Sequence, residues 1–123
     1  MIQVFAPGIP QVYYVGFLAG KNDLDLLEKT KEGRNINRHY YTNEEIAEEV
    51  RRPVVQALLK LFTFRNQSAA FDLDGSIDVE ILDENTLVIT RRNQGSSVVA
   101  EAQINLKELS YAVKENGEEV TFL

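Results

Sequence analysis

Hydrophobic and polar positions change their spacing along the chain, and each change marks a different predicted structure. Residues 1–20 contain no charged side chain. From residue 53 apolar positions recur at helical spacing, and from residue 71 they alternate with polar ones. The pattern therefore predicts an α+β chain in which helices precede an antiparallel sheet.

The uncharged start predicts a turn followed by a buried strand. Residues 6–8 read Ala-Pro-Gly, which is turn chemistry, and residues 12–15 are all β-branched or aromatic. Such a run is typical of a strand buried on both faces, as in a parallel sheet covered by helices. No βα repeat follows, so the strand lacks partners in this chain, which indicates a piece of a larger protein. We expect the apolar side chains of residues 1–20 to have no packing partners in this chain and to promote self-association.

Two reasons argue against reading this start as a signal peptide or a membrane helix. No basic residue precedes the apolar run, although a signal peptide needs one. Pro7, Gly8 and Pro10 lie close together, and Pro10 would interrupt a membrane helix. We therefore expect no membrane partner.

Helix signals organise residues 21–68. Asp23 is placed to cap a short helix over residues 24–29, which Gly33 would end. Residues 33–41 show neither the helical nor the strand spacing of apolar residues, and they are expected to form a loop. Thr42 and Glu45 form a capping box for a helix that runs to about residue 52. Pro53 suits the first turn of a second helix, which is expected to end near residues 66–68.

Five short antiparallel strands are predicted after residue 71. Alternating runs cover residues 77–81, 87–90, 98–106, 109–113 and 120–122, with one face apolar and the other wet. Turn sequences separate them, and Asn116-Gly117 is the strongest hairpin signal among these.

Composition narrows the function classes. The 123 residues include no cysteine and one histidine, which excludes disulfide scaffolds, thiolate zinc sites and clusters of histidine ligands. The formal net charge of −6 argues against nucleic acid as a partner. The absence of cysteine and of a signal peptide favours a cytoplasmic location.

Candidate chemistry is sparse when judged from residue types and spacing. His39 is expected to be a structural, hydrogen-bonded histidine, because no nucleophile lies at a recognisable spacing. Arg34 and Arg38 could bind a phosphate or a sugar hydroxyl, or could pair with a carboxylate at residue 23, 28 or 32. Asp72 and Asp74, with the acidic residues 78 and 80, do not meet the calcium-loop pattern and suit a solvated strand face. No metal site and no catalytic constellation is predicted.

Several sequence stretches resemble a known family. Residues 7–16 resemble the last barrel strand of glycoside hydrolase family 13, the α-amylase superfamily, and residues 8–16 within them fit the pattern G-x-P-x-x-Y-Y-x-G. The runs L-A-G-K-N-D at 18–23, G-R-N-I-N-R-H-Y-Y at 33–41 and R-P-V-V at 52–55 resemble the sucrose phosphorylases within it. The match continues through residues 65–72 and covers the chain, but only about the last quarter of such an enzyme.

The resemblance implies a fold and an activity. Residues 1–67 would be the end of a (β/α)₈ barrel, contributing its last strand and helices, and residues 68–123 a small antiparallel β domain. The family transfers glucose from sucrose to phosphate with retention, giving α-glucose 1-phosphate and fructose. A carboxylate nucleophile and a carboxylic acid carry that chemistry, and no cofactor is implied.

The resemblance also assigns one site residue. The nucleophile, the acid/base and the transition-state carboxylate lie on earlier strands, so no catalytic residue is expected in this chain. Arg34 matches the arginine that holds a hydroxyl of the bound glucose ring. Asn37, Arg38 and His39 are expected to shape the loop.

Two alternatives remain open. The parent enzyme could be a sister phosphorylase that acts on sucrose 6′-phosphate or glucosylglycerate, since the discriminating loops lie upstream. The chain could instead be a non-catalytic β module that binds sugar or protein. The expected partner under the leading interpretation is the missing part of the barrel.

Overall fold

The computed structural model describes residues 1–122, which form two compact units. The first unit combines residues 1–10 with residues 60–122, and the second contains residues 11–59. Leu123, the last residue of the expected β domain, lies outside the described residues.

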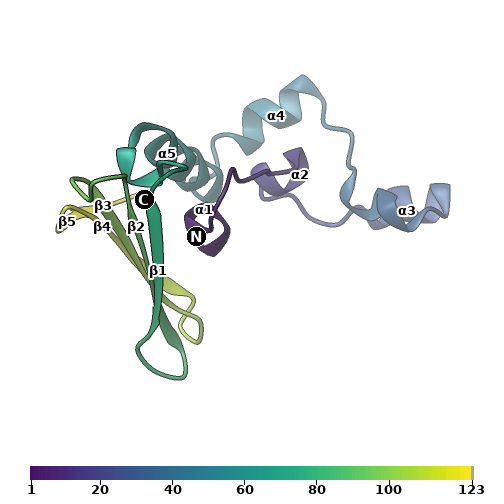
Figure 1. The fold of residues 1–123 in the computed structure, drawn as a ribbon. Helices are drawn as coiled ribbons and strands as arrows, with labels where there is room; N and C mark the ends of the chain where they lie inside the picture. Colours follow the sequence, from purple (N-terminus) through teal and green to yellow (C-terminus); the bar gives the residue numbers. More distant parts are fainter. Residues whose placement is uncertain (123) are drawn as a thin grey trace. The chain divides into compact units, whose positions relative to one another are not determined.

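Helical elements occupy the first 71 residues (Figure 1). The helical elements are α1 (Ile2–Phe5), α2 (Tyr14–Phe17), α3 (Leu24–Thr30), η1 (Gly33–Asn37), α4 (Asn43–Glu49), α5 (Pro53–Gln67) and η2 (Ala69–Phe71). The end of α5 at Gln67 confirms the prediction that this helix stops near residues 66–68.

A five-stranded antiparallel sheet occupies the rest of the described chain, as predicted. Its strands are β1 (Ser76–Ile81), β2 (Thr86–Arg92), β3 (Val99–Asn105), β4 (Ser110–Glu115) and β5 (Glu118–Val120). They pair in chain order, each with the next, as a meander (Figure 1). The register places Val79, Ile89, Ala102 and Val113 in one row, so the predicted apolar positions share a face.

The turns follow their local sequence, with one exception. Asn116 and Gly117 have φ values of 50° and 86°, as a two-residue hairpin with both central residues left-handed requires. Leu109, predicted to lie on the apolar strand face, instead has a φ of 52° in the turn before β4 and is exposed. The preceding Asn105 side chain accepts the N–H groups of residues 107 and 108 and fixes that turn.

Burial on the sheet departs from the simple two-face expectation. Along β3 the alternation is regular, with Ala100, Ala102 and Ile104 buried. On β2, however, Thr86, Val88 and Thr90 are also buried, although they belong to the face predicted to be wet. At the edge, Val79 and Ile81 lie on the apolar face yet are 62% and 78% exposed. We call Val79, Ile81 and the half-exposed Tyr111 the sheet-face patch.

The first ten residues pack into the core of their unit. This corrects the expectation that residues 1–20 have no packing partners in the chain. Val4 and Phe5 are buried, and the Phe5 ring meets Phe71 edge-on with centroids 5.0 Å apart. Two buried arginines hold the same segment by its carbonyl oxygens. Arg65 donates to the carbonyls of residues 4 and 8, and Arg91 donates to that of residue 6.

The second unit corrects the prediction of a strand over residues 12–15. These residues do not join a sheet; instead Tyr14 begins α2, and Phe17 N–H donates to the carbonyl of Tyr13. A β-strand needs a hydrogen-bonded neighbour, and no described strand pairs with this run. Val15 and Leu18 are nevertheless buried, so apolar residues of this segment also find packing partners.

Three smaller boundaries also differ from prediction. The helix capped by Asp23 ends at Thr30, and its left-handed C-cap is Lys31, with a φ of 55°, rather than Gly33. Gly33 begins the 3₁₀ helix η1 inside the expected loop. The helix that begins after Thr42 ends at Glu49, three residues before the predicted end, because two turn-type bonds close it over residues 51 and 52.

Candidate functional site

The candidate site lies in the second unit, where polar side chains surround a hollow. The hollow is lined by the segment before α3, by α3 itself, by the segment after η1, and by α4 with residue 52 beyond it. Its charged lining residues are Lys21, Asp23, Asp25, Lys29, His39, Glu45, Glu48, Glu49 and Arg52.

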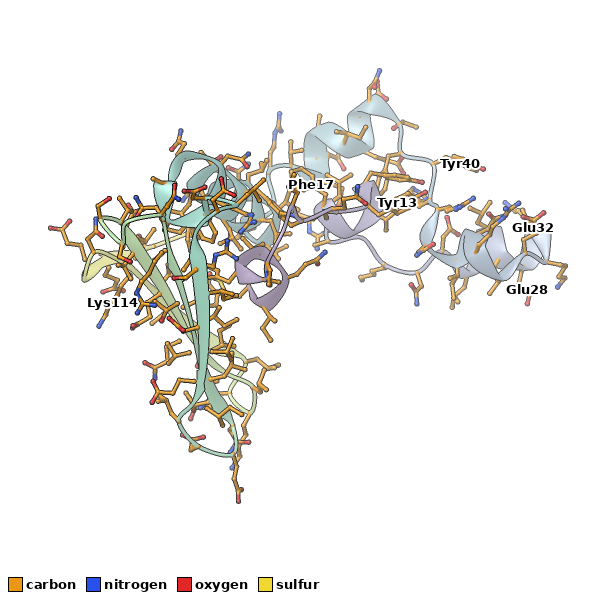
Figure 2. All side chains as sticks on the ribbon, viewed as in Figure 1. Tyr13, Phe17, Glu28, Glu32, Tyr40 and Lys114 are labelled. Carbon is orange, nitrogen blue, oxygen red and sulfur yellow. The ribbon has the colours of Figure 1, made fainter. Side chains whose placement is uncertain are left out.

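Arg34, the residue that the family resemblance assigned to sugar binding, lies in η1. Its guanidinium pairs with Glu32, with Nε and Nη2 each 3.0 Å from Oε2, and its side chain is 67% exposed. Glu32 lies on the outside of the unit (Figure 2). The next residue, Asn35, is buried and donates from Nδ2 to the Thr30 hydroxyl at 3.0 Å, which ties η1 to the end of α3.

Asp23 joins three parts of the unit. Its Oδ1 accepts the N–H of Leu26 at 2.8 Å, as predicted for the N-cap of α3. Its own N–H donates to the carbonyl of Ile36 at 2.6 Å, which fixes η1 beside the start of α3. Its Oδ2 lies 2.7 Å from His39 Nδ1.

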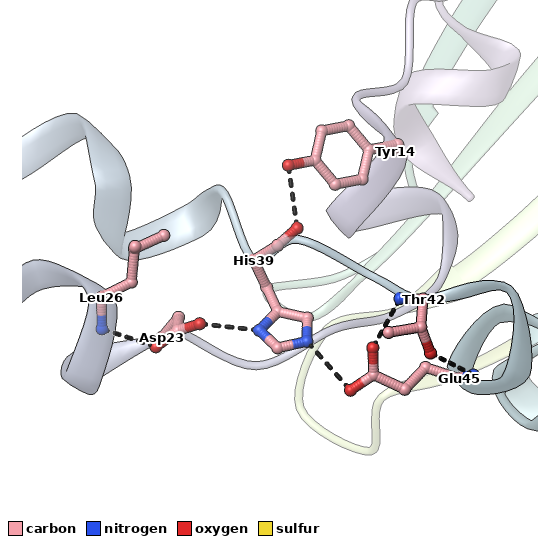
Figure 3. A network of polar contacts seen from close by, with 6 residues as sticks. All are labelled: Tyr14, Asp23, Leu26, His39, Thr42 and Glu45. Atoms are coloured by element: carbon pink, nitrogen blue, oxygen red, sulfur yellow. Dashed lines mark hydrogen bonds and ion pairs between the residues drawn. The ribbon is translucent and has the colours of Figure 1, made fainter.

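His39 stands between two carboxylates (Figure 3). While Nδ1 faces Asp23, Nε2 lies 3.3 Å from Oε1 of Glu45. The carbonyl of His39 accepts the Tyr14 hydroxyl at 3.0 Å, and the Tyr41 ring packs edge-on against the imidazole at 4.6 Å. The expectation of a hydrogen-bonded histidine is confirmed.

Glu45 belongs at once to this network and to the predicted capping box of α4. Its Oε2 accepts the Thr42 N–H at 2.6 Å, and its N–H donates to the Thr42 hydroxyl at 3.2 Å (Figure 3). One oxygen of the Glu45 carboxylate therefore caps the start of α4, and the other contacts His39.

The two tyrosines of the 33–41 motif differ in exposure, because Tyr41 is half-buried. Tyr40 is exposed and extends away from its segment (Figure 2), whereas the Tyr41 hydroxyl approaches Gly20. A Cβ at residue 20 would lie 2.2 Å from that hydroxyl oxygen and 2.9 Å from Val15 Cγ1. Only glycine allows this approach.

Hydrogen bonds of the network shift the pKa values of His39, Asp23 and Glu45. The hydrogen bond to Asp23 raises the pKa of His39 above its ordinary value, against desolvation, and Glu45 adds to the rise. Hydrogen bonds from His39 and from the Leu26 N–H lower the pKa of Asp23. The Thr42 N–H and then His39 lower the pKa of Glu45.

The acidic candidates of residues 72–80 have partners of their own. In the first unit, Asp72 accepts the backbone N–H groups of residues 74 and 94, while Asp78 pairs with Arg92 across the strands. Within residues 1–122 no group of three or more histidine or acidic side chains is arranged to hold a metal ion. Sequence reasoning missed the pairing of His39 with Asp23 and Glu45, because sixteen residues separate the first pair and no periodic signal links them.

Comparisons with known proteins give the chain its relatives. It is 69% identical over 122 residues to a sucrose phosphorylase of Streptococcus mutans, which covers 99% of this chain and 25% of that protein. It is 43% identical to a glucosylglycerol phosphorylase of Marinobacter adhaerens over 95% of this chain and 24% of that protein. No protein-family model matches the chain.

A solved structure agrees with these relatives. The crystal structure of sucrose 6F-phosphate phosphorylase from Thermoanaerobacter thermosaccharolyticum superposes with a TM-score of 0.87 at 46% identity, over 99% of this chain and 25% of that one. In the described part of the chain, no helix is long and apolar enough to cross a membrane. The chain thus spans about a quarter of the length of the relatives it matches, and it belongs to the sucrose phosphorylase family as a C-terminal portion.

Proposed function

We propose that the chain is the C-terminal portion of a cytoplasmic enzyme that transfers glucose from sucrose to phosphate, giving α-glucose 1-phosphate and fructose with retention. The identity of 69% over 122 residues to a sucrose phosphorylase is the observation that carries this proposal. In it, residues 1–67 are the end of the catalytic barrel and residues 68–123 its β domain.

The chemistry of a retaining transfer divides between two carboxyl groups, one as nucleophile and the other as acid and then base. In the proposed assignment both belong to the part of the enzyme outside this chain, so the chain by itself has no phosphorolytic activity. No organic cofactor or metal takes part.

The test measures glucose 1-phosphate. We expect none when the purified chain is incubated with sucrose and phosphate. The longer enzyme of which the chain is proposed to be a portion should form it. Turnover by the isolated chain at an ordinary enzymatic rate would overturn the assignment.

Donor specificity is decided in the same assay. Relatives named for sucrose 6(F)-phosphate and for glucosylglycerol are 48% and 43% identical to this chain, below the 69% of the sucrose phosphorylase. We therefore place sucrose first. A panel of sucrose, sucrose 6′-phosphate, glucosylglycerol and glucosylglycerate with phosphate should rank sucrose highest in kcat/KM.

Arg34 is the proposed substrate-binding residue, holding a hydroxyl of the glucose ring. Arg34 does not line the hollow, but its side chain is exposed, and it lies in η1, which Asp23 holds through the carbonyl of Ile36. An exposed guanidinium on a fixed element supports this role. In the longer enzyme, Arg34→Ala should lower kcat/KM by roughly 10- to 150-fold, the loss of a charged hydrogen bond of about 1.5–3 kcal/mol.

Two further variants make the Arg34 experiment specific. Arg34→Lys should restore only part of the rate, because the planar fork of donors is lost. Arg51→Ala, which removes another exposed arginine of the same unit, should leave kcat/KM near the wild-type value. A folded Arg34→Ala enzyme with unchanged kcat/KM would show that the Glu32 pair is the whole role of Arg34.

We also propose that the chain packs against the rest of the barrel in the complete enzyme. When isolated, it should self-associate. The sheet-face patch of Val79, Ile81 and Tyr111 supports this, because apolar side chains at an exposed sheet face favour contact with another surface. Light scattering after size exclusion should show species larger than the 14.0 kDa monomer.

A further inference from the structure

His39 faces two groups that can only accept hydrogen bonds. Its Nδ1 lies 2.7 Å from Asp23 and its Nε2 lies 3.3 Å from Glu45. A neutral imidazole has a single N–H, whereas an ionised carboxylate has none. Only the imidazolium can therefore donate to both neighbours at once.

The two carboxylates lie at the two ends of the segment that carries Arg34. Asp23 precedes α3 and Glu45 lies in the first turn of α4, so residues 24–44 form a loop whose ends meet at His39. Asp23 also holds η1 directly, through its N–H and the Ile36 carbonyl at 2.6 Å. Asp23 therefore links His39 directly to η1, the element that contains Arg34: its side chain contacts His39 and its N–H bonds to η1.

We propose that His39 is a positioning residue which, as an imidazolium, clamps Asp23 to Glu45 and so holds η1 and Arg34 in place. The proposal rests on the proposed role of Arg34 in binding sugar. His39 touches no reacting atom in this scheme; it acts through the segment that it closes.

The charges around His39 set the pH at which the clamp holds. Asp23 comes from the loop before α3 and Glu45 from α4, while Tyr14 of α2 contacts the backbone of residue 39 and the Tyr41 ring covers one side. The other charged residues of the hollow are Lys21, Asp25, Lys29, Glu48, Glu49 and Arg52. The two carboxylates are the groups in hydrogen-bond contact with the ring.

The direction of the pH dependence follows from these contacts. Because Asp23 and Glu45 raise the pKa of His39, the stabilisation is complete below the ordinary histidine value of about 6.5 and is lost as pH rises through the folded-state pKa. The pKa values of Asp23 and Glu45 are lowered, so their share is lost as pH falls through those values. The clamp should be strongest between about pH 4.5 and pH 6.5.

NMR of the imidazole in the 123-residue chain tests the clamp without any substrate. The chain has a single histidine, so the signal needs no assignment. We expect His39 to titrate above the value found for the same chain in urea. Above that pH the amide of residue 23, bonded to Ile36, should lose protection from hydrogen exchange.

Two conservative variants separate the clamp from the helix caps. Asp23→Asn keeps an N-cap side chain, and Glu45→Gln keeps the capping box, but each removes one charge beside His39. Each should shift the His39 pKa downward and remove the pH dependence of the exchange at residue 23. The control Glu48→Gln, which alters another carboxylate of the hollow, should change neither.

The outcomes distinguish this proposal from the proposed function. A His39 pKa at or below the unfolded value, or equal shifts in Asp23→Asn and Glu48→Gln, would overturn the clamp whatever the enzyme does. If the clamp holds and Arg34→Ala leaves kcat/KM unchanged, the sugar-binding role fails alone. If both hold, kcat/KM of the longer enzyme should fall as pH rises through the pKa of His39, and His39→Gln should remove that fall.

Discussion

At the scale of single residues, Gly20 shows how a close approach dictates residue type. A Cβ there would meet the Tyr41 hydroxyl at 2.2 Å and Val15 Cγ1 at 2.9 Å, and Val15 is buried. We expect Gly20→Ala to reduce the free energy of unfolding by about 1–3 kcal/mol, the usual cost of overpacking. Urea denaturation followed by tyrosine fluorescence measures this change.

Gly33 supplies the matched control within the same unit. No atom lies within 4 Å of a Cβ placed at residue 33, and its φ lies outside the left-handed region. Gly33→Ala should therefore be neutral or stabilise the chain by up to about 1 kcal/mol, through a less flexible unfolded state. Equal destabilisation by both variants would refute the steric argument at Gly20.

At the scale of elements, local signals were predictable and long-range pairing was not. The capping box of Thr42 and Glu45, the Asp23 cap and the Asn116-Gly117 hairpin each depend on neighbours within a few residues, and all three are present. The strand predicted over residues 12–15 depends on partners elsewhere, and the segment instead forms a turn of helix at Tyr14.

In the candidate site, too, the residues could be predicted from the sequence but the contacts between distant segments could not. The family resemblance singled out Arg34 and placed His39 in a loop-shaping role, and the structure puts both in one unit. The junction of His39 with Asp23 and Glu45 could not be predicted, since it joins three segments through side chains alone.

The hairpin between β4 and β5 carries the prediction at this scale. Gly117 has a φ of 86°, where an L side chain is strained. Gly117→Ala should lower the free energy of unfolding of its unit by roughly 1–2 kcal/mol and loosen the pairing of β5. Gly117→Asn should cost less, because asparagine tolerates left-handed backbone. Amide exchange at Val113, which pairs with Val120, reports the result, and equal effects of the two variants would contradict the conformational explanation.

At the scale of the whole molecule, the first ten residues contribute to the stability of the first unit, which contains the sheet and is called the β unit below. The sequence suggested that this apolar start would lack partners and impair solubility. In the structure Val4 and Phe5 are buried against the unit, and Arg65 and Arg91 hold the carbonyl oxygens of the same segment. Two buried arginines would lose these acceptors if the segment were absent, which makes its removal more costly than lost apolar burial alone.

Deleting residues 1–10 should therefore destabilise the β unit rather than improve it. The loss should be at least that of Phe5→Ala, about 3–5 kcal/mol for a buried phenylalanine, because the deletion also removes Val4 and the carbonyl acceptors. Ile2→Ala is the matched control, since Ile2 lies on the same helical turn but is 46% exposed, and it should cost far less. Hydrogen exchange at Ala100 and Ala102 of β3 reports on this unit alone. A deleted chain that keeps wild-type protection at these amides and gains solubility would show that the segment is dispensable, and that its burial adds nothing to the stability of the sheet.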